Sequence, residues 1–211
     1  MDRSARKVRQ ELSADGLFKL IRCRFDLLSD ARAESAGITL TDALMSAFAM
    51  FSLKDPSLLA FDQRRQDPSD NFRTVYGIKI VPCDTQMRTI IDPVDPAHVR
   101  PLFQDVFRCL QRGKALETFV YLDGHYLLSL DGTTYFSSKK VHCPSCLEKH
   151  HSNGSVTYSH QILGAMLVHP DQKVVIPLPP EPIINEDGHT NSGRSTRTEK
   201  SNTSVGSQTS C

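Results

Sequence analysis

The sequence predicts an α+β protein in which a helical N-terminal region precedes a β-rich region and a polar C-terminal tail. Apolar residues recur at helical spacing over residues 12–28 and 99–110, a pattern typical of amphipathic helices. Strand-like runs separated by Asp-Gly dipeptides follow from residue 117. Eleven of the last 26 residues are Ser or Thr. The segment therefore has too few apolar side chains to offset the entropy that ordering it would cost. We therefore divide the chain into residues 1–115, 116–185 and 186–211.

The helical region contains several start and stop signals. Residues 12–28 predict a first helix, and residues 39–53 predict a second, with Thr39 or Thr41 as its N-cap. A shorter helix is expected at residues 57–65. Asp84 or Thr85 is the expected cap of a further helix, and the helix at residues 99–110 is expected to stop at Gly113.

The β-rich region is predicted from alternating β-branched and aromatic runs. Residues 118–122 and 126–130 are expected to form two strands joined by a hairpin at Asp123-Gly124. The second strand is expected to end at Asp131-Gly132. Further strands are predicted at residues 156–168 and 173–178.

Composition restricts the classes of partner. The chain has 211 residues, 25 Lys and Arg against 24 Asp and Glu, and a formal net charge of +1. No field over the whole molecule attracts nucleic acid or membrane, so such a site must be a local patch. The longest apolar run, residues 43–53, is too short to span a bilayer, and no apolar segment follows the basic N-terminus as in a secretory signal. We expect a cytoplasmic protein without a membrane partner.

Asp131 is the first candidate for chemistry. A carboxylate at the end of a buried strand is a common ligand of Mg²⁺, which prefers hard oxygen ligands and completes its shell with water or phosphate. The alternative is that Asp131-Gly132 simply forms a turn, which is what this dipeptide most often does.

A Cys- and His-rich segment is the second candidate. Cys143 and Cys146 have the Cys-x-x-Cys spacing of a zinc knuckle. The third ligand is expected to be His150 or His151 and the fourth His160, which would make a structural Zn²⁺ site without an open position. The alternative is a polar loop with two free thiols.

Five short motifs occur in a characteristic order. They are residues 72–79 (FRTVYGIK), 82–88 (PCDTQMR), 130–139 (LDGTTYFSSK), 143–146 (CPSC) and 156–161 (VTYSHQ). Together they resemble the N-terminal half of bacterial insertion-sequence transposases of the DDE type, over residues 20–189. The resemblance implies a helical DNA-engaging region and an RNase H-like catalytic domain. In that domain three acidic residues hold two Mg²⁺ ions for attack on a DNA phosphodiester, and Asp131 would be the first acid.

The chain departs from this family after residue 178. The further strands and helices that would carry the second and third acids do not follow, and Glu186 and Asp187 lie in the polar tail. The resemblance therefore implies an incomplete RNase H-like antiparallel sheet in a truncated or frame-shifted transposase. We expect this chain to be catalytically inactive and to retain binding to transposon DNA ends, with full-length transposase or a second copy as a protein partner.

Two other functions compete with this interpretation. One is a zinc-stabilised interaction module without a DNA function, based on the Cys- and His-rich segment. The other is an active metal nuclease that recruits further acids, with Asp123, Asp84 and Glu117 as the candidates. A metal-dependent cleavage assay discriminates the nuclease from the inactive fragment.

Overall fold

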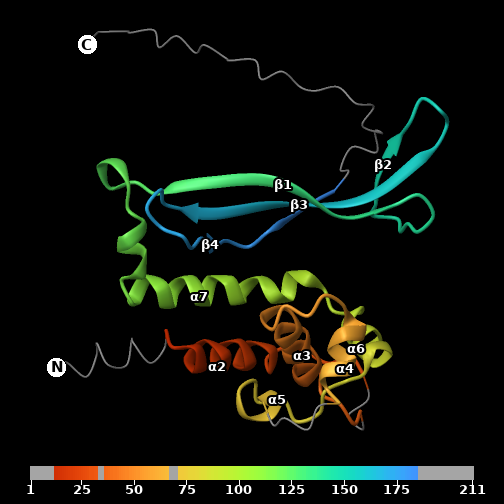
Figure 1. Cartoon of the computed structure of the whole chain (residues 1–211), viewed down its shortest axis with the longest axis horizontal. Coiled ribbons are helices and arrows are strands. Elements are labelled where there is room, and N and C mark those ends of the chain that lie inside the picture. The colour runs from red at the N-terminus through yellow and green to blue at the C-terminus, as the bar shows by residue number, and fades with distance from the viewer. Residues whose placement is uncertain (1–11, 33–35, 67–70, 185–211) are drawn as a thin grey trace, which may run out of the picture. The chain divides into compact units, whose positions relative to one another are not determined.

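The computed structural model describes residues 12–32, 36–66 and 71–184. Helices come first along the chain and an antiparallel sheet follows them (Figure 1), so the α+β prediction is confirmed. The predicted tail, residues 186–211, lies outside the described residues.

The described elements follow one another in two groups. The helices are α2 (Ala14–Phe25), α3 (Leu40–Ser52), α4 (Leu58–Arg64), α5 (Asn71–Thr74), α6 (Asp84–Ile91) and α7 (Arg100–Arg112), with the 3-10 turns η1 (Pro96–Val99), η2 (Ala115–Phe119) and η3 (Leu122–Gly124). The strands are β1 (Leu127–Ser138), β2 (Leu147–His150), β3 (Val156–Val168), β4 (Ile176–Pro177) and β5 (Glu181–Ile183).

These elements pack into two units. The helical unit comprises the described residues up to Leu130 together with Gly164–Pro179. The distal sheet unit comprises Asp131–Leu163 together with the segment that begins at Pro180. The chain passes from one unit into the other within β1 and again within β3.

Hydroxyl caps set the first residues of three helices. Ser13, Thr39 and Ser57 each accept a hydrogen bond through the side chain from the backbone N–H three residues later, at 3.0–3.1 Å. Such a bond satisfies one of the N–H groups that a helix start leaves without a partner. Thr39 rather than Thr41 is therefore the cap of α3.

The start of α6 differs from the prediction by one residue. Cys83, not Asp84 or Thr85, is the N-cap residue of α6. Its backbone N–H donates to the side-chain oxygen of Gln86 at 3.1 Å. Asp84 instead accepts from Arg88 one turn later at 2.8 Å.

The core of the helical unit is centred on α3. Ala43, Met45 and Ala49 of this helix are fully buried, and Phe61 and Ile78 are each 1% exposed. The aromatic rings that surround them are in edge or stacked contact: Phe18 with Phe48 and Tyr76, and Phe61 with Phe72. This burial of large apolar side chains is the main force that holds α2 to α6 together.

Arg24 of α2 and Asp105 of α7 form an ion pair that joins the two helices, and Arg108 adds a second bond to the same carboxylate at 3.1 Å. The hydrogen bond from Arg24, aided by the positive charge of Arg24 and Arg108, holds the pKa of Asp105 below its usual value. The pair therefore contributes stability above the unfolded-state pKa of about 3.9 and loses it as the pH falls through the lower folded-state pKa.

We predict that Asp105→Asn lowers the melting temperature of the full chain at neutral pH, and that the difference from the wild type shrinks as the pH approaches about 3. Thermal unfolding of both proteins followed by circular dichroism over this range tests the prediction. If the difference in melting temperature between the two proteins does not change with pH, the charge of the Asp105 carboxylate contributes nothing to stability.

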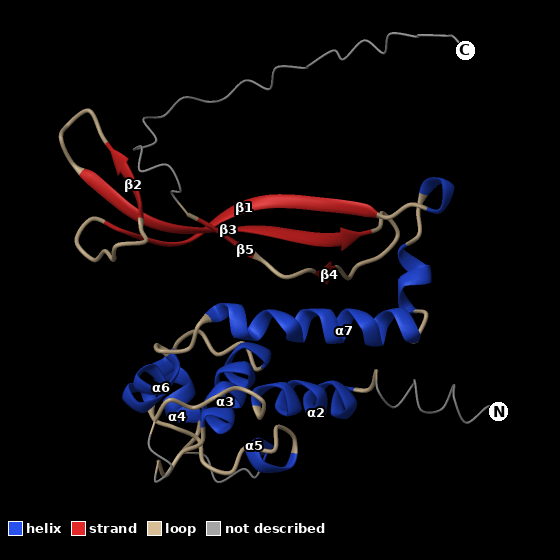
Figure 2. Cartoon of the chain, turned by 180° about the vertical axis from the view of Figure 1, so that it is seen from behind, coloured by secondary structure: helices blue, strands red, loops and turns tan. Residues whose placement is uncertain are grey.

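The central strand of the sheet is β3, with β1 beside it and three short strands along it (Figure 2). β2 pairs antiparallel with β3 from Leu147↔Ser159 to His150↔Val156. β5 pairs with the next segment of β3, and β4 pairs with the segment after that. The short strands thus follow one another along β3, and of the strand predicted at residues 173–178 only Ile176–Pro177 is formed.

The strand predicted at residues 118–122 is wrong. This segment begins in the 3-10 turn η2, which buries Leu116 and Phe119 together with Leu167 and Ile176. Residues three apart lie on one side of a 3-10 turn, so this burial favours the turn over a strand. Only the bridge between Val120 and Tyr126 remains of the predicted hairpin, and the tight turn at Asp123-Gly124 has positive φ at both residues.

Candidate metal centre

Cys143 and Cys146 lie in the loop between β1 and β2, and His160 lies on β3. The backbone N–H of Cys146 donates to the carbonyl of Cys143 at 3.1 Å, which closes a tight turn. The backbone N–H of Cys143 is in turn 3.3 Å from the sulfur of Cys146. This local turn directs both thiols to one side of the loop. His160, 14 residues after Cys146, lies on the long strand β3 with its imidazole next to the two thiols.

The three ligand atoms are spaced as a metal ion requires. Cys143 Sγ and Cys146 Sγ are 3.6 Å apart, and His160 Nε2 lies 3.2 Å from the first and 3.4 Å from the second. A tetrahedral Zn²⁺ with ordinary bond lengths separates two sulfur ligands by about 3.8 Å and a sulfur from a nitrogen by about 3.6 Å. The group can hold a metal ion, and thiolate and imidazole ligands favour Zn²⁺ over Mg²⁺.

Two aromatic rings of β1 orient the imidazole of His160. Tyr135 stacks on the imidazole with a centroid distance of 5.9 Å and an interplanar angle of 17°, and Phe136 contacts it at 5.7 Å. Neither residue belongs to the ligand set that the sequence predicts. The sequence shows that Tyr135 and Phe136 lie shortly before the Cys-rich loop. It does not show that β1 pairs with β3, which brings the two rings to His160.

The histidine predicted as the third ligand, His150 or His151, makes other contacts. His151 Nε2 bonds to Thr157 Oγ1 at 2.8 Å, and His150 Nε2 lies 3.2 Å from a carboxylate oxygen of Glu148. The register His150↔Val156 places both histidines at the end of β2 that is further from His160. Within the described parts of the chain the site thus has three protein ligands, and the expectation of a closed four-ligand site that includes His151 is corrected.

Asp131 lies within β1 rather than at its end, and its side chain is exposed. Both sequence interpretations of this residue, a turn and the end of a buried strand, are therefore wrong about its local structure. Among the residues the structure describes, Asp131 belongs to no group of three or more ligand atoms that could hold a metal ion. The structure thus gives no support for Mg²⁺ at this carboxylate.

The acids considered for a nuclease do not gather into a metal-binding group among the described residues. Asp84 pairs with Arg88 at 2.8 Å, and Glu117 lies 3.6 Å from Lys114. Asp123 sits in the left-handed turn before β1. None of the three joins Asp131 in a metal-binding group over the described residues.

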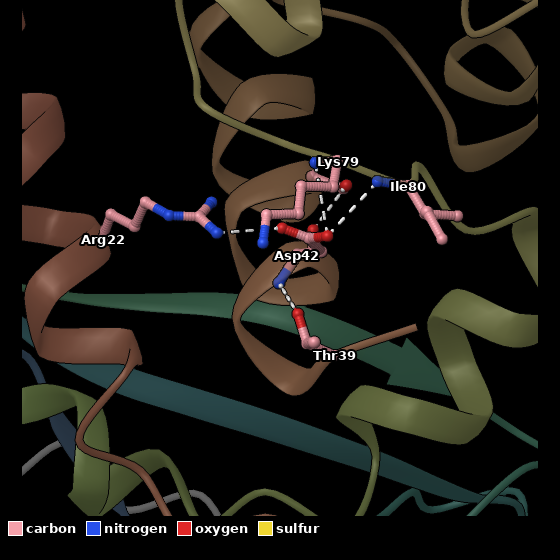
Figure 3. Close-up of polar contacts among 6 residues, drawn as sticks. Arg22, Thr39, Asp42, Lys79 and Ile80 are labelled. Atoms are coloured by element: carbon pink, nitrogen blue, oxygen red, sulfur yellow. Dashed lines mark hydrogen bonds and ion pairs between the residues drawn. The ribbon is translucent and has the colours of Figure 1, made fainter. Parts of the chain in front are cut away.

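A buried carboxylate that the sequence analysis missed lies in the helical unit (Figure 3). Asp42, 2% exposed, accepts from Arg22 through one oxygen at 3.2 Å. Its other oxygen accepts from the backbone N–H groups of Lys79 and Ile80 at 3.3 and 3.2 Å. Its own N–H donates to the capping hydroxyl of Thr39.

These contacts use both oxygens of Asp42, so the carboxylate joins three segments of the helical unit and has a structural role. The Thr-x-x-Asp spacing of Thr39 and Asp42 is a recognisable helix-start signal. Nothing in the sequence pattern indicates Lys79 and Ile80 as the other partners.

Comparison with protein-family models, with curated proteins and with solved structures finds no match to the chain. None of the helices in the described ranges combines the length and the apolar character that crossing a membrane requires.

Proposed function

We propose that the chain is the N-terminal portion of a DDE-type transposase, which binds DNA and does not by itself transfer DNA strands. The single observation that carries this proposal is the position of the motif segments on paired strands. Residues 130–139 fall on β1 and its end, and residues 156–161 fall on β3 beside it. An RNase H-like domain begins with a first strand that carries the first acid and with two antiparallel strands after it. β1 with Asp131, then β3, then the short strands β4 and β5 follow this order along the chain, with β2 as an additional short strand between β1 and β3.

Inactivity follows from the ligand chemistry. Two divalent ions about 4 Å apart clamp the attacking and leaving oxygens in this class of reaction, and one carboxylate cannot hold both of them. Asp131 is exposed and belongs to no group of three or more metal-ligating side chains in the described ranges. The chain would therefore bind DNA through groups other than Asp131. Any effect on transposition would require a protein partner that supplies the catalytic acids.

The expected result is that the full chain binds a duplex from the ends of the parent element more tightly than a scrambled duplex, without cleaving either in Mg²⁺. Fluorescence anisotropy over a salt titration measures the binding, because each phosphate contact steepens the salt dependence. Asp131→Asn is the matched control, and its binding should be unchanged.

Two outcomes would contradict the proposal. Equal binding to both duplexes would remove the claim that the chain recognises transposon ends. Mg²⁺-dependent cleavage that Asp131→Asn abolishes would favour the nuclease interpretation instead.

A zinc-stabilised interaction module is the second candidate, favoured by the arrangement of Cys143, Cys146 and His160. In this function the metal ties the loop between β1 and β2 to β3, and DNA plays no part. Zinc binding together with no preference for any DNA would favour it over the transposase fragment.

A further inference from the structure

The Cys143–Cys146 turn places two thiols close to each other at the surface. Cys143 is exposed and Cys146 is partly exposed, while their sulfur atoms are 3.6 Å apart. A disulfide requires about 2.05 Å between the sulfurs. The same two atoms are therefore placed to share a metal ion and, after a small local movement, to bond with each other.

We propose that Cys143, Cys146 and His160 bind Zn²⁺, and that the site releases the metal when the two thiolates are oxidised to a disulfide. The proposal rests on the zinc site of the second candidate function and adds its regulation. It does not depend on DNA binding.

Solvent access to the site supports the oxidation step. Zinc binding requires deprotonated thiols, and the thiolate is the form of cysteine that peroxides attack. The rings of Tyr135 and Phe136 lie against His160, whereas Cys143 remains exposed. A small oxidant can therefore reach a sulfur atom without unfolding the sheet.

The reaction is balanced with a peroxide as the oxidant. The two thiolates give up two electrons and form one S–S bond. Hydrogen peroxide takes these electrons with two protons, its O–O bond breaks, and two waters form. Zinc remains Zn²⁺ throughout. A disulfide sulfur is a poor zinc ligand, so His160 alone remains to hold the ion and the ion leaves. A dithiol reductant reverses the step.

Metal release would remove the link between the two cysteines and His160 of β3, while β2 stays paired with β3. The two cysteines precede β2, and in the zinc-bound form the ion would link them to His160. Oxidation thus exchanges a contact between the loop and β3 for a bond within the loop. The local structure of this loop would then depend on the redox state of its surroundings.

The experiment uses the full chain, reduced and loaded with Zn²⁺. Hydrogen peroxide is added in steps, and a zinc-chelating dye measures the released metal. Peptide mapping by mass spectrometry measures the Cys143–Cys146 disulfide. We expect one zinc ion bound per chain at the start, zinc release in equal amount to this disulfide, and rebinding after dithiothreitol. Cys143→Ser and His160→Ala should each abolish zinc binding at equimolar metal.

Cys23→Ser is the matched control, because Cys23 is an exposed thiol on α2 that is not part of the candidate metal group. This variant should bind and release zinc as the wild type does. Two outcomes overturn the proposal and differ in what they imply. A reduced chain that binds no zinc removes the metal site itself. A chain that binds zinc and retains it while the disulfide forms leaves the zinc module standing and removes only its redox control.

Discussion

Replacing Asp42 by alanine is expected to lower the free energy of unfolding of the helical unit by about 3–5 kcal/mol, as the removal of one partner of a buried ion pair does. The change leaves Arg22 without its carboxylate, and it takes the acceptor from the backbone N–H groups of Lys79 and Ile80. Among the described residues, the buried Nη1 nitrogen of Arg22 already has no hydrogen-bond partner, so the loss of Asp42 adds to the cost of burying this guanidinium.

Urea unfolding of the full chain, followed by far-ultraviolet circular dichroism, measures this effect. Asp84→Ala is the control, since Asp84 pairs with Arg88 at the surface and its removal should change the unfolding free energy by less than about 1 kcal/mol. Equal effects of the two substitutions would contradict the structural role of Asp42. A double variant with Arg22→Met then tests whether Arg22 and Asp42 act as a pair.

Zinc is expected to stabilise the loop between β1 and β2 that carries Cys143 and Cys146. A ligand that binds only the folded state at a thousand times its dissociation constant contributes about 4 kcal/mol. We therefore predict strongly slowed amide exchange over residues 139–163 when Zn²⁺ is added to the reduced chain. Removal of zinc with a chelator should restore fast exchange in this segment and leave α2 to α6 unchanged. Hydrogen exchange read by mass spectrometry reports both segments in one measurement.

Two histidine variants make this test specific. His160→Ala should lose the zinc-dependent protection, because His160 supplies one of the three ligand atoms. His151→Ala should keep it, since the imidazole of His151 bonds to Thr157 instead. Equal loss in both variants, or protection that does not depend on zinc, would contradict the three-ligand site.

The helices were predictable because their signals are local. Thr39 and Ser57 are followed by apolar residues at helical spacing, and Gly113 ends α7 where a C-cap glycine is expected. Each of these features acts within one or two turns of the chain. At α6 the predicted N-cap, Asp84 or Thr85, is only one or two residues from the observed N-cap, Cys83. The sequence signal locates the start of this helix, and the backbone conformation decides which of the adjacent residues is the cap.

The strands were predicted less well because their pairing is not local. Residues 118–122 have strand-like composition, yet the burial of Leu116 and Phe119 with Leu167 and Ile176 favours a 3-10 turn. Asp131-Gly132 reads as a turn in isolation, but the chain continues through it as β1. In both places a partner from a distant segment outweighs the local preference.

By itself the sequence determined the α+β class, the position of most helices to within a few residues, and the Cys-x-x-Cys pair, whose thiols suit zinc. These depend on residues within a few positions of one another. Tertiary structure alone decided that His160 rather than His151 faces the two thiols, because the register of β2 on β3 selects the histidine. It also decided that Asp42 is bound by Lys79 and Ile80, more than thirty residues away. Contacts of this kind form only when the core and the sheet bring distant segments together, and no short pattern encodes them.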